Sequence, residues 1–129
     1  MFERIRASFC KWTPWEERLL ASLTERLGHK HREVLRKQLE AVVKIQRILD
    51  WSEINLYANN SWEGVPKFFD DREFSLARAS TFVGAKRIQS ECFCVKGHFF
   101  SIESNAPVKH LAFCHDVRIE VFDVDKRFL

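Results

Sequence analysis

The sequence predicts an α+β fold in which an N-terminal helical hairpin packs on a five-stranded, mostly antiparallel curved sheet, with a β-meander in the C-terminal half. Two observations support this prediction. Apolar residues recur with a helical period up to residue 49, and beyond Asp50 they alternate with polar residues as in β-strands. The 129 residues include only 4 Gly and 3 Pro, which leaves little material for linkers. We therefore expect residues 1–129 to form a single α+β domain.

The first predicted helix covers residues 14–27. Thr13 occupies the N-cap, Pro14 suits the first helical position, and Glu16 completes a capping box with Thr13. Apolar side chains then recur every four residues, at Leu19, Leu23 and Leu27. Gly28 follows, and we expect it to take the left-handed conformation that ends many helices.

The second predicted helix covers residues 30–49. Its apolar face follows spacings of three and four residues, at Leu35, Leu39, Val42, Ile45 and Leu49. No glycine or proline interrupts it. Because only a short break separates the two helices, we expect them to form an antiparallel hairpin.

Five strands are predicted, at residues 54–58, 76–83, 87–95, 98–104 and 117–124. With a two-residue turn at Lys96-Gly97, the strands divide their side chains between two faces. The face expected to pack on the helices carries Ala77, Ala79, Thr81, Val83, Ile88, Cys92, Cys94 and Phe99. The opposite face mixes apolar and polar side chains: Leu76, Phe82, Phe93, Val95, Phe100 and Ile102 with Arg78, Gln89, Glu91 and His98. A slip of one residue in register would exchange the two faces.

The basic charge lies mainly in the N-terminal part. Residues 1–49 carry 11 basic against 6 acidic side chains, and the remaining residues carry 10 against 12. No segment approaches the ~20 apolar residues that span a bilayer, and the N-terminal residues lack the apolar run of a signal peptide. We therefore expect a cytoplasmic protein with free thiols and no membrane partner.

Two clusters of side chains contain residue types that could bind a metal or a nucleic acid. Cys92, Cys94, His98, Cys114 and His115 are the candidates for a zinc site, but the spacing of Cys92 and Cys94 puts both on one strand face and away from His98. Buried cysteines act as small apolar residues, so we expect no metal and no cofactor. A basic patch comprises Arg26, Lys30, Arg32, Arg36 and Lys37. It lacks interleaved aromatic residues and any known reading module, so a solvated helix face is favoured over a nucleic-acid site.

The sequence contains no phosphate-binding loop, dinucleotide fingerprint, zinc-protease motif or nucleophile elbow, so a role without catalysis is favoured. The mixed aromatic and charged sheet face is typical of interfaces. We therefore predict an interaction or accessory protein that binds a protein partner or a second copy of itself. The candidate interface or ligand residues are Trp51, Tyr57, Phe82, Phe93, His98 and Phe100.

The predicted order of elements leads to a second hypothesis. Two helices, a strand, an irregular segment and four strands resemble the cone-shaped α+β folds of the nuclear-transport-factor-2-like group. In that group a curved sheet wraps helices around a pocket, so the resemblance implies a small ligand bound or converted between sheet and helices. That pocket would lie near Trp51, Tyr57 and His98.

Overall fold

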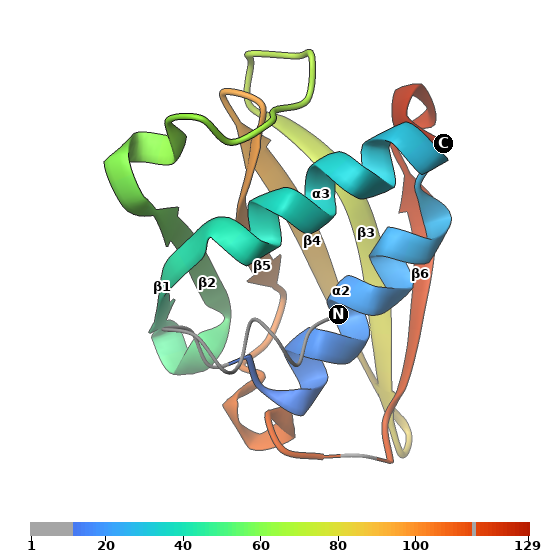
Figure 1. Cartoon of the computed structure of the whole chain (residues 1–129). Helices are drawn as coiled ribbons and strands as arrows, with labels where there is room; N and C mark the ends of the chain where they lie inside the picture. The colour runs from blue at the N-terminus through green and yellow to red at the C-terminus, as the bar shows by residue number, and fades with distance from the viewer. Residues whose placement is uncertain (1–11, 115) are drawn as a thin grey trace.

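A computed structural model describes residues 12–114 and 116–129, and it places two helices on one face of a six-stranded antiparallel sheet (Figure 1). The predicted α+β class and helical hairpin are confirmed, with one strand more than expected. The helices are α2 (Pro14–Arg26) and α3 (His29–Ala41). The strands are β1 (Val42–Ile48), β2 (Glu53–Ala58), β3 (Phe74–Val83), β4 (Lys86–Val95), β5 (His98–Ser104) and β6 (Arg118–Val124), in the spatial order β1-β2-β5-β4-β3-β6.

Helix α2 begins with the predicted capping box. The Thr13 hydroxyl accepts from the Glu16 amide at 3.3 Å, and the Glu16 carboxylate accepts from the Thr13 amide at 2.9 Å. These two bonds satisfy backbone donors that a helix start otherwise leaves unpaired. The face behind the cap is buried completely, since Leu19, Leu20 and Leu23 are 0% exposed.

The second helix ends at Ala41, so its predicted extension to Leu49 is wrong. Residues Val42–Ile48 form strand β1 instead, antiparallel to β2, with Ile45 opposite Leu56. The reason lies in side-chain shape. Four of the seven residues of β1 are valine or isoleucine, and β-branched side chains lose rotamer freedom in a helix but pack well on a pleated sheet.

Strands β3, β4 and β5 form the predicted meander, but β6 does not continue it. The last strand returns to pair with β3, where Thr81 lies opposite Ile119. Strands β1 and β6 are therefore the two edges of the sheet. No helix in the described part of the chain combines the length and apolar character needed to cross a lipid bilayer.

The predicted division of the two sheet faces holds over most of β3 and β4. Seven of the eight residues expected to face the helices are buried: Ala77, Ala79, Thr81, Ile88, Cys92, Cys94 and Phe99. Ile102 was expected on the opposite face, and that prediction is wrong. A bulge between Phe93 and Cys94 shifts the register, so Ile102 lies opposite Cys92 and is 0% exposed. A second bulge, between Ser75 and Ala77, lets Leu76 reach the core as well.

Gly28 is required by a close approach of backbone, and the predicted left-handed conformation is wrong. Its φ of −62° is ordinary, and its amide donates to the Phe128 carbonyl at 2.8 Å. A Cβ atom at this position would lie 2.8 Å from the Leu129 carbonyl oxygen. The junction between α2 and α3 therefore holds residues 128–129 against the helices.

Replacing Gly28 with alanine is expected to lower the free energy of unfolding by about 1–3 kcal/mol, because the new methyl group forces the backbone at Leu129 to move. Urea unfolding monitored by tryptophan fluorescence measures the change. Gly84→Asn is the matched control, because Gly84 has a φ of 58° in open space and asparagine tolerates that conformation. An equal loss in both variants would show that glycine conformation, and not crowding, is responsible.

Candidate interaction surface

The sheet face opposite α2 and α3, called the outer face from here on, has no α-helix or strand of the described chain packed on it (Figure 1), and only the short turn at Asn59–Trp62 packs on one corner. Strand alternation fixes which residues it presents. Ile54 and Leu56 on β2 are buried in the core, so Glu53, Asn55 and Tyr57 point the other way. The outer face has three regions: an aromatic corner, a row of glutamates, and an end where arginines pack on aromatic rings.

The first region is the aromatic corner, formed by Tyr57, Trp62, His98 and Phe100. The rings of Trp62 and His98 stack with centroids 4.9 Å apart and planes 10° apart. Tyr57 meets Phe100 edge-on at 5.5 Å. A pocket of about 240 Å³ opens beside them, lined by Ser61, Trp62, Val95, Lys96, His98 and Phe100.

Trp62 reaches this corner through an unusual turn that sequence reasoning did not predict. Asn60, Ser61 and Trp62 have φ values of 52°, 51° and 71°, all in the left-handed region. Asparagine enters the left-handed region readily, but for serine and tryptophan this conformation costs roughly 1–2 kcal/mol per residue relative to the right-handed one. The Asn59-Asn60 pair was the one local signal for such a turn. The strained turn directs the indole onto His98.

His98 is a largely buried imidazole, only 9% exposed. Burial lowers its pKa, and the nearby Lys67 charge lowers it further, while a hydrogen bond to the Val65 backbone acts in the opposite direction. Its Nε2 atom has no hydrogen-bond partner among the described residues. The ring is therefore neutral near pH 7, and it lines the corner pocket with one ring nitrogen unpaired among the described residues.

The lowered pKa of His98 predicts a pH dependence of stability. Below the ordinary value of 6.5, the unfolded state binds a proton that the folded state refuses, so the free energy of unfolding falls as the pH drops from 7 towards 5. Urea unfolding across this range measures the slope. His98→Gln should reduce the slope and leave the part that comes from His31, because burial and the neighbouring Lys30 also lower the pKa of His31. His110→Gln is the substitution control at an exposed site. Equal slopes in the wild type and His98→Gln would contradict the prediction.

The second region is the glutamate row, formed by Glu53, Glu103 and Glu91. Glu53 lies directly opposite Glu103 in the β2–β5 pair, and Glu103 directly opposite Glu91 in the β5–β4 pair. Like charges in such positions destabilise a sheet. Among the described residues none of the three forms an ion pair, and Arg78, opposite Glu91 on β3, bonds to Asp123 instead at 2.9 Å. The row thus concentrates negative charge that has no ion-pair partner among the described residues.

Replacing Glu103 with glutamine should raise the free energy of unfolding by about 0.2–1 kcal/mol, because it removes the middle charge of the row. Thermal or urea unfolding at low ionic strength measures the gain. Glu120→Gln is the control, since Glu120 pairs with Arg118 at 3.2 Å and should gain nothing. A loss of stability in Glu103→Gln would mean that the row is compensated within the fold.

The third region lies at the opposite end of β3, β4 and β6 and combines arginines with aromatic rings. The Arg118 guanidinium lies 4.0 Å from the centre of the Phe82 ring. Arg87 and Arg78 lie 5.5 Å and 5.4 Å from the Phe122 ring. Cation–π contacts of this kind stabilise exposed sites modestly and keep the side chains in place.

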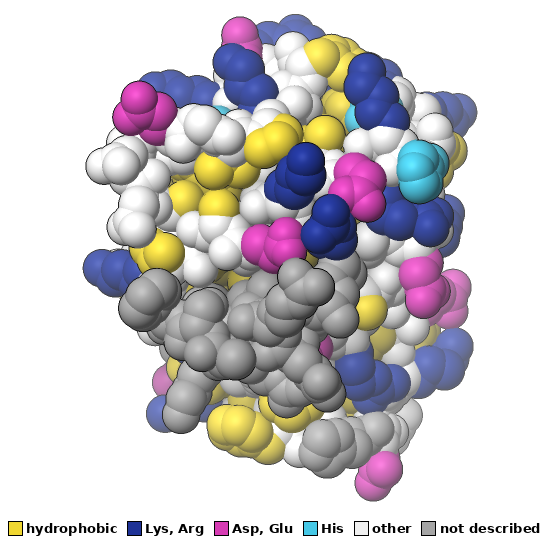
Figure 2. Space-filling model, in the orientation of Figure 1, with side chains coloured by type: hydrophobic (Ala, Val, Ile, Leu, Met, Phe, Trp, Pro, Cys, Tyr) yellow, Lys and Arg dark blue, Asp and Glu magenta, His cyan; other side chains and the backbone are white. Residues whose placement is uncertain are grey.

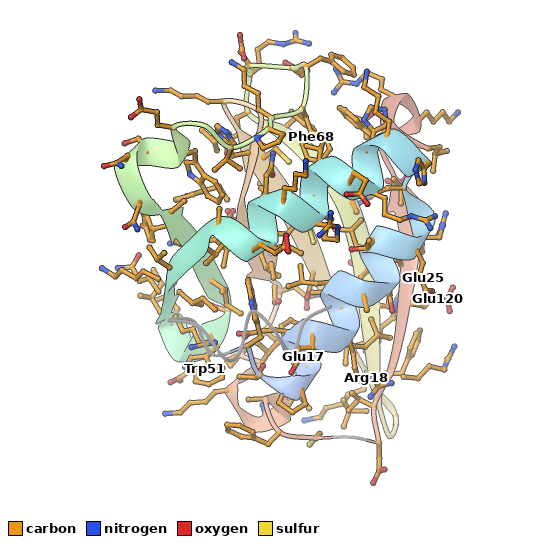
Figure 3. The ribbon with its side chains drawn as sticks, in the orientation of Figure 1. Glu17, Arg18, Glu25, Trp51, Phe68 and Glu120 are labelled. Atoms are coloured by element: carbon orange, nitrogen blue, oxygen red, sulfur yellow. The ribbon has the colours of Figure 1, made fainter. Side chains whose placement is uncertain are left out.

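The predicted site residues therefore divide into three groups. Tyr57, His98 and Phe100 meet in the aromatic corner, and Phe93 lies on the same face opposite Ser101. Phe82 belongs to the third region, where it packs against Arg118. Trp51 lies apart, at the β1–β2 connection, where its ring packs 4.9 Å from the Arg47 guanidinium (Figure 3).

The residues of the predicted basic patch are largely used within the fold. Arg26 donates to the Val121 carbonyl, and Arg32 donates to the Leu27 carbonyl at 3.2 Å at the end of α2. Arg36 pairs with both Glu33 and Glu40 on α3. Lys30 and Lys37 remain exposed. Figure 2 shows Lys, Arg, Asp and Glu interspersed over this side of the molecule.

Two of the candidate zinc ligands are core residues. Cys92 and Cys94 are 1% and 0% exposed, and burial raises the pKa of the Cys92 thiol to about 12 and that of Cys94 further still. Both thiols are protonated at neutral pH and behave as small apolar groups. No cluster of three metal-binding side chains occurs within residues 12–114 and 116–129. Cys10 and His115 lie outside the described residues.

Aspartates of the irregular segment and the C-terminus are held by arginines. The Asp70 carboxylate accepts from Arg72 at 3.2 Å and from Arg127 at 2.6 Å, and these bonds hold its pKa well below the ordinary range. Arg127 also pairs with Asp125 at 2.7 Å, which lowers the pKa of Asp125. These carboxylates fix residues 67–74 to the chain end and are ionised at neutral pH.

The space between helices and sheet is packed with side chains, among them Leu20, Leu56 and Phe99, each 0% exposed. The three residues that the second hypothesis places around an interior pocket do not surround one space. Tyr57 and His98 belong to the outer face, and Trp51 lies at the end of a hairpin.

Comparison with protein-family models, curated proteins and solved structures finds no match for this chain.

Proposed function

We propose that this protein is a small interaction protein that binds a protein partner through its outer face. The observation that carries the proposal is a six-stranded sheet whose outer face bears half-exposed aromatic rings between arginines and glutamates, with no covering layer in the described chain. Aromatic residues and arginine are the types enriched at interfaces. We also propose a cytoplasmic location, where reduced thiols such as Cys92 and Cys94 are the default.

The size of the outer face supports a partner of protein dimensions. Six strands about 4.8 Å apart, with about 3.3 Å per residue over seven residues, give a flat area of roughly 550 Å². With side-chain relief, this approaches the ~800 Å² that each partner contributes to a standard interface.

The size of the corner pocket favours a partner's side chain over a free small molecule. Pockets that bury drug-sized ligands measure about 300–1,000 Å³. The corner pocket is about 240 Å³ and opens onto the face. At protein interfaces, the anchor residues of one partner fill well-packed pockets near the centre of the other's contact surface.

Photo-crosslinking tests the proposal. p-Benzoylphenylalanine replaces Phe100 in the aromatic corner, and in a control protein it replaces the exposed Lys37 on α3. We expect irradiation of producing cells to give one discrete adduct from position 100 and none from position 37. The partner, once identified by mass spectrometry, is purified and titrated against the wild type and Tyr57→Ala. Equal adducts from both positions, or none from position 100, would contradict the proposal.

A further inference from the structure

We infer that the partner's contacting segment is cationic: it places a lysine or arginine on the glutamate row and an apolar side chain in the corner pocket, about 10–14 Å apart. This inference rests on the proposed function and specifies the chemistry of the partner.

The glutamate row is the first reason. Three carboxylates lie directly opposite one another across β2, β5 and β4, and none of them forms an ion pair with a described residue. Arg78, which lies opposite Glu91, pairs with Asp123 instead. Among residues 12–114 and 116–129, the side-chain hydrogen bonds to the row come from the Asn55 amide, at 3.0 Å from Glu53, and from the weaker Ser101 hydroxyl contact to Glu103 at 3.5 Å. Glu53 and Glu91 are half-buried. A partner's cation would remove this repulsion on binding, which the isolated fold does not do.

The shape of the surface is the second reason. A polar hollow of about 180 Å³ lies beside the row, lined by Arg78, Gln89, Ser90, Glu91, Glu103 and Asn105. Arg78 is held at one side by Asp123, which leaves Glu91 and Glu103 to meet an incoming cation. The corner pocket offers a mainly apolar site nearby, since Trp62, Val95 and Phe100 line it together with Ser61, Lys96 and His98.

Strand geometry sets the spacing between the two sites. Glu91 and Val95 are four residues apart on β4, and Phe100 and Glu103 are three apart on β5, which corresponds to about 10–14 Å at the rise of a strand. An extended polypeptide covers that distance in three or four residues. The expected motif is therefore an apolar residue and a lysine or arginine separated by two or three others.

The sign of the charge also selects against other occupants. Nucleic acids and anionic lipid surfaces present phosphates, which the glutamate row repels, although the arginines of the third region would attract them at the other end of the face. A polypeptide supplies both the cation and the apolar anchor in one chain, which the two neighbouring sites require.

The test uses ¹⁵N-labelled full-length protein titrated with three synthetic peptides. In the first, three serines separate a lysine pair from a leucine; the second has glutamates in place of the lysines; the third lacks the leucine. We expect only the first to shift both the amides of Glu91 and Glu103 and the Trp62 indole. The double variant Glu91→Gln/Glu103→Gln should weaken its binding at least about fivefold.

Glu120→Gln is the matched control, an exposed glutamate on β6 (Figure 3) that is paired with Arg118 and lies outside the row. It should bind the first peptide as the wild type does. Equal binding of the acidic peptide, or an equal loss in Glu120→Gln, would overturn the inference. Sedimentation gives a further test. If the wild type self-associates and Glu91→Gln/Glu103→Gln does not, the inference is also wrong, because the outer face then binds a second copy of the chain.

The two proposals fail separately. If position 100 crosslinks to a partner whose affinity is unchanged in Glu91→Gln/Glu103→Gln, the cationic inference is wrong and the proposed function stands. If position 100 yields no adduct, the proposed function is wrong.

Discussion

Replacing Arg47 with methionine is expected to lower the free energy of unfolding by about 3–5 kcal/mol. Arg47 on β1 makes a two-bond ion pair with Glu16 on α2, with both N···O distances at 2.8 Å. The Glu16 side chain is 0% exposed and that of Arg47 only 19%. The substitution leaves a carboxylate in the interior without its counter-charge, and a buried unpaired charge is among the most costly defects in a fold.

A double variant separates charge from packing. Glu16→Gln/Arg47→Met has no buried charge, and glutamine still accepts the Thr13 amide in the capping box. It should be more stable than Arg47→Met in urea unfolding. Arg118→Met, which breaks an exposed pair, should cost less than about 1 kcal/mol. If the double variant were as unstable as Arg47→Met, lost packing of the arginine stem would be the cause.

Replacing Gln38 with leucine is expected to lower the free energy of unfolding by about 2–4 kcal/mol. The Gln38 amide is 0% exposed and connects α3 to two other segments. Its Nε2 donates to the carbonyls of Pro66 and Gly97 at 2.9 Å and 3.0 Å, and its Oε1 accepts from the Phe99 amide at 2.9 Å. Leucine fills the same space but leaves buried backbone groups without these partners.

The Gln38→Glu variant tests this explanation through pH. An ionised carboxylate would still accept from Phe99 but would face two carbonyl oxygens, while a protonated one can donate to a carbonyl. We therefore expect this variant to lose less stability, relative to the wild type, at pH 5 than at pH 8 in urea unfolding. Gln89→Leu, at an exposed position, should change stability by less than about 0.5 kcal/mol. A pH-independent loss in Gln38→Glu would contradict the hydrogen-bond explanation.

Local signals in the sequence were sufficient for most of the fold. The capping box of Thr13 and Glu16 and the Lys96-Gly97 turn each depend on a few adjacent residues, and each is present in the structure. Strand β1 was missed because Leu39, Val42, Ile45 and Leu49 fit a helical spacing. The choice between helix and strand there is made by pairing with β2, which is a tertiary contact.

The outer face was predictable only in part, because strand alternation is a local signal but the pairing of strands is a tertiary contact. Strand alternation alone places Phe93 opposite to the buried Cys92 and Cys94. The glutamate row depends on the pairing registers of three strands, and Glu53 precedes Glu91 by 38 residues in the chain. A bulge in the β4–β5 pair also shifts the register between those two strands by one residue. Trp62 reaches His98 only through three consecutive left-handed residues, which no residue preference of serine or tryptophan indicates.

Helix α3 passes into β1 without an intervening loop, since Ala41 ends the helix and Val42 begins the strand. A loop would absorb relative motion of the two elements through its own torsion angles, and here no such hinge exists. Edge strands commonly fray first, but β1 is fixed at one end to a helix that Gln38 ties to the β4–β5 turn. We therefore expect helix α3 and edge strand β1 to open as one cooperative unit, so that a displacement of α3 would reach the border of the outer face.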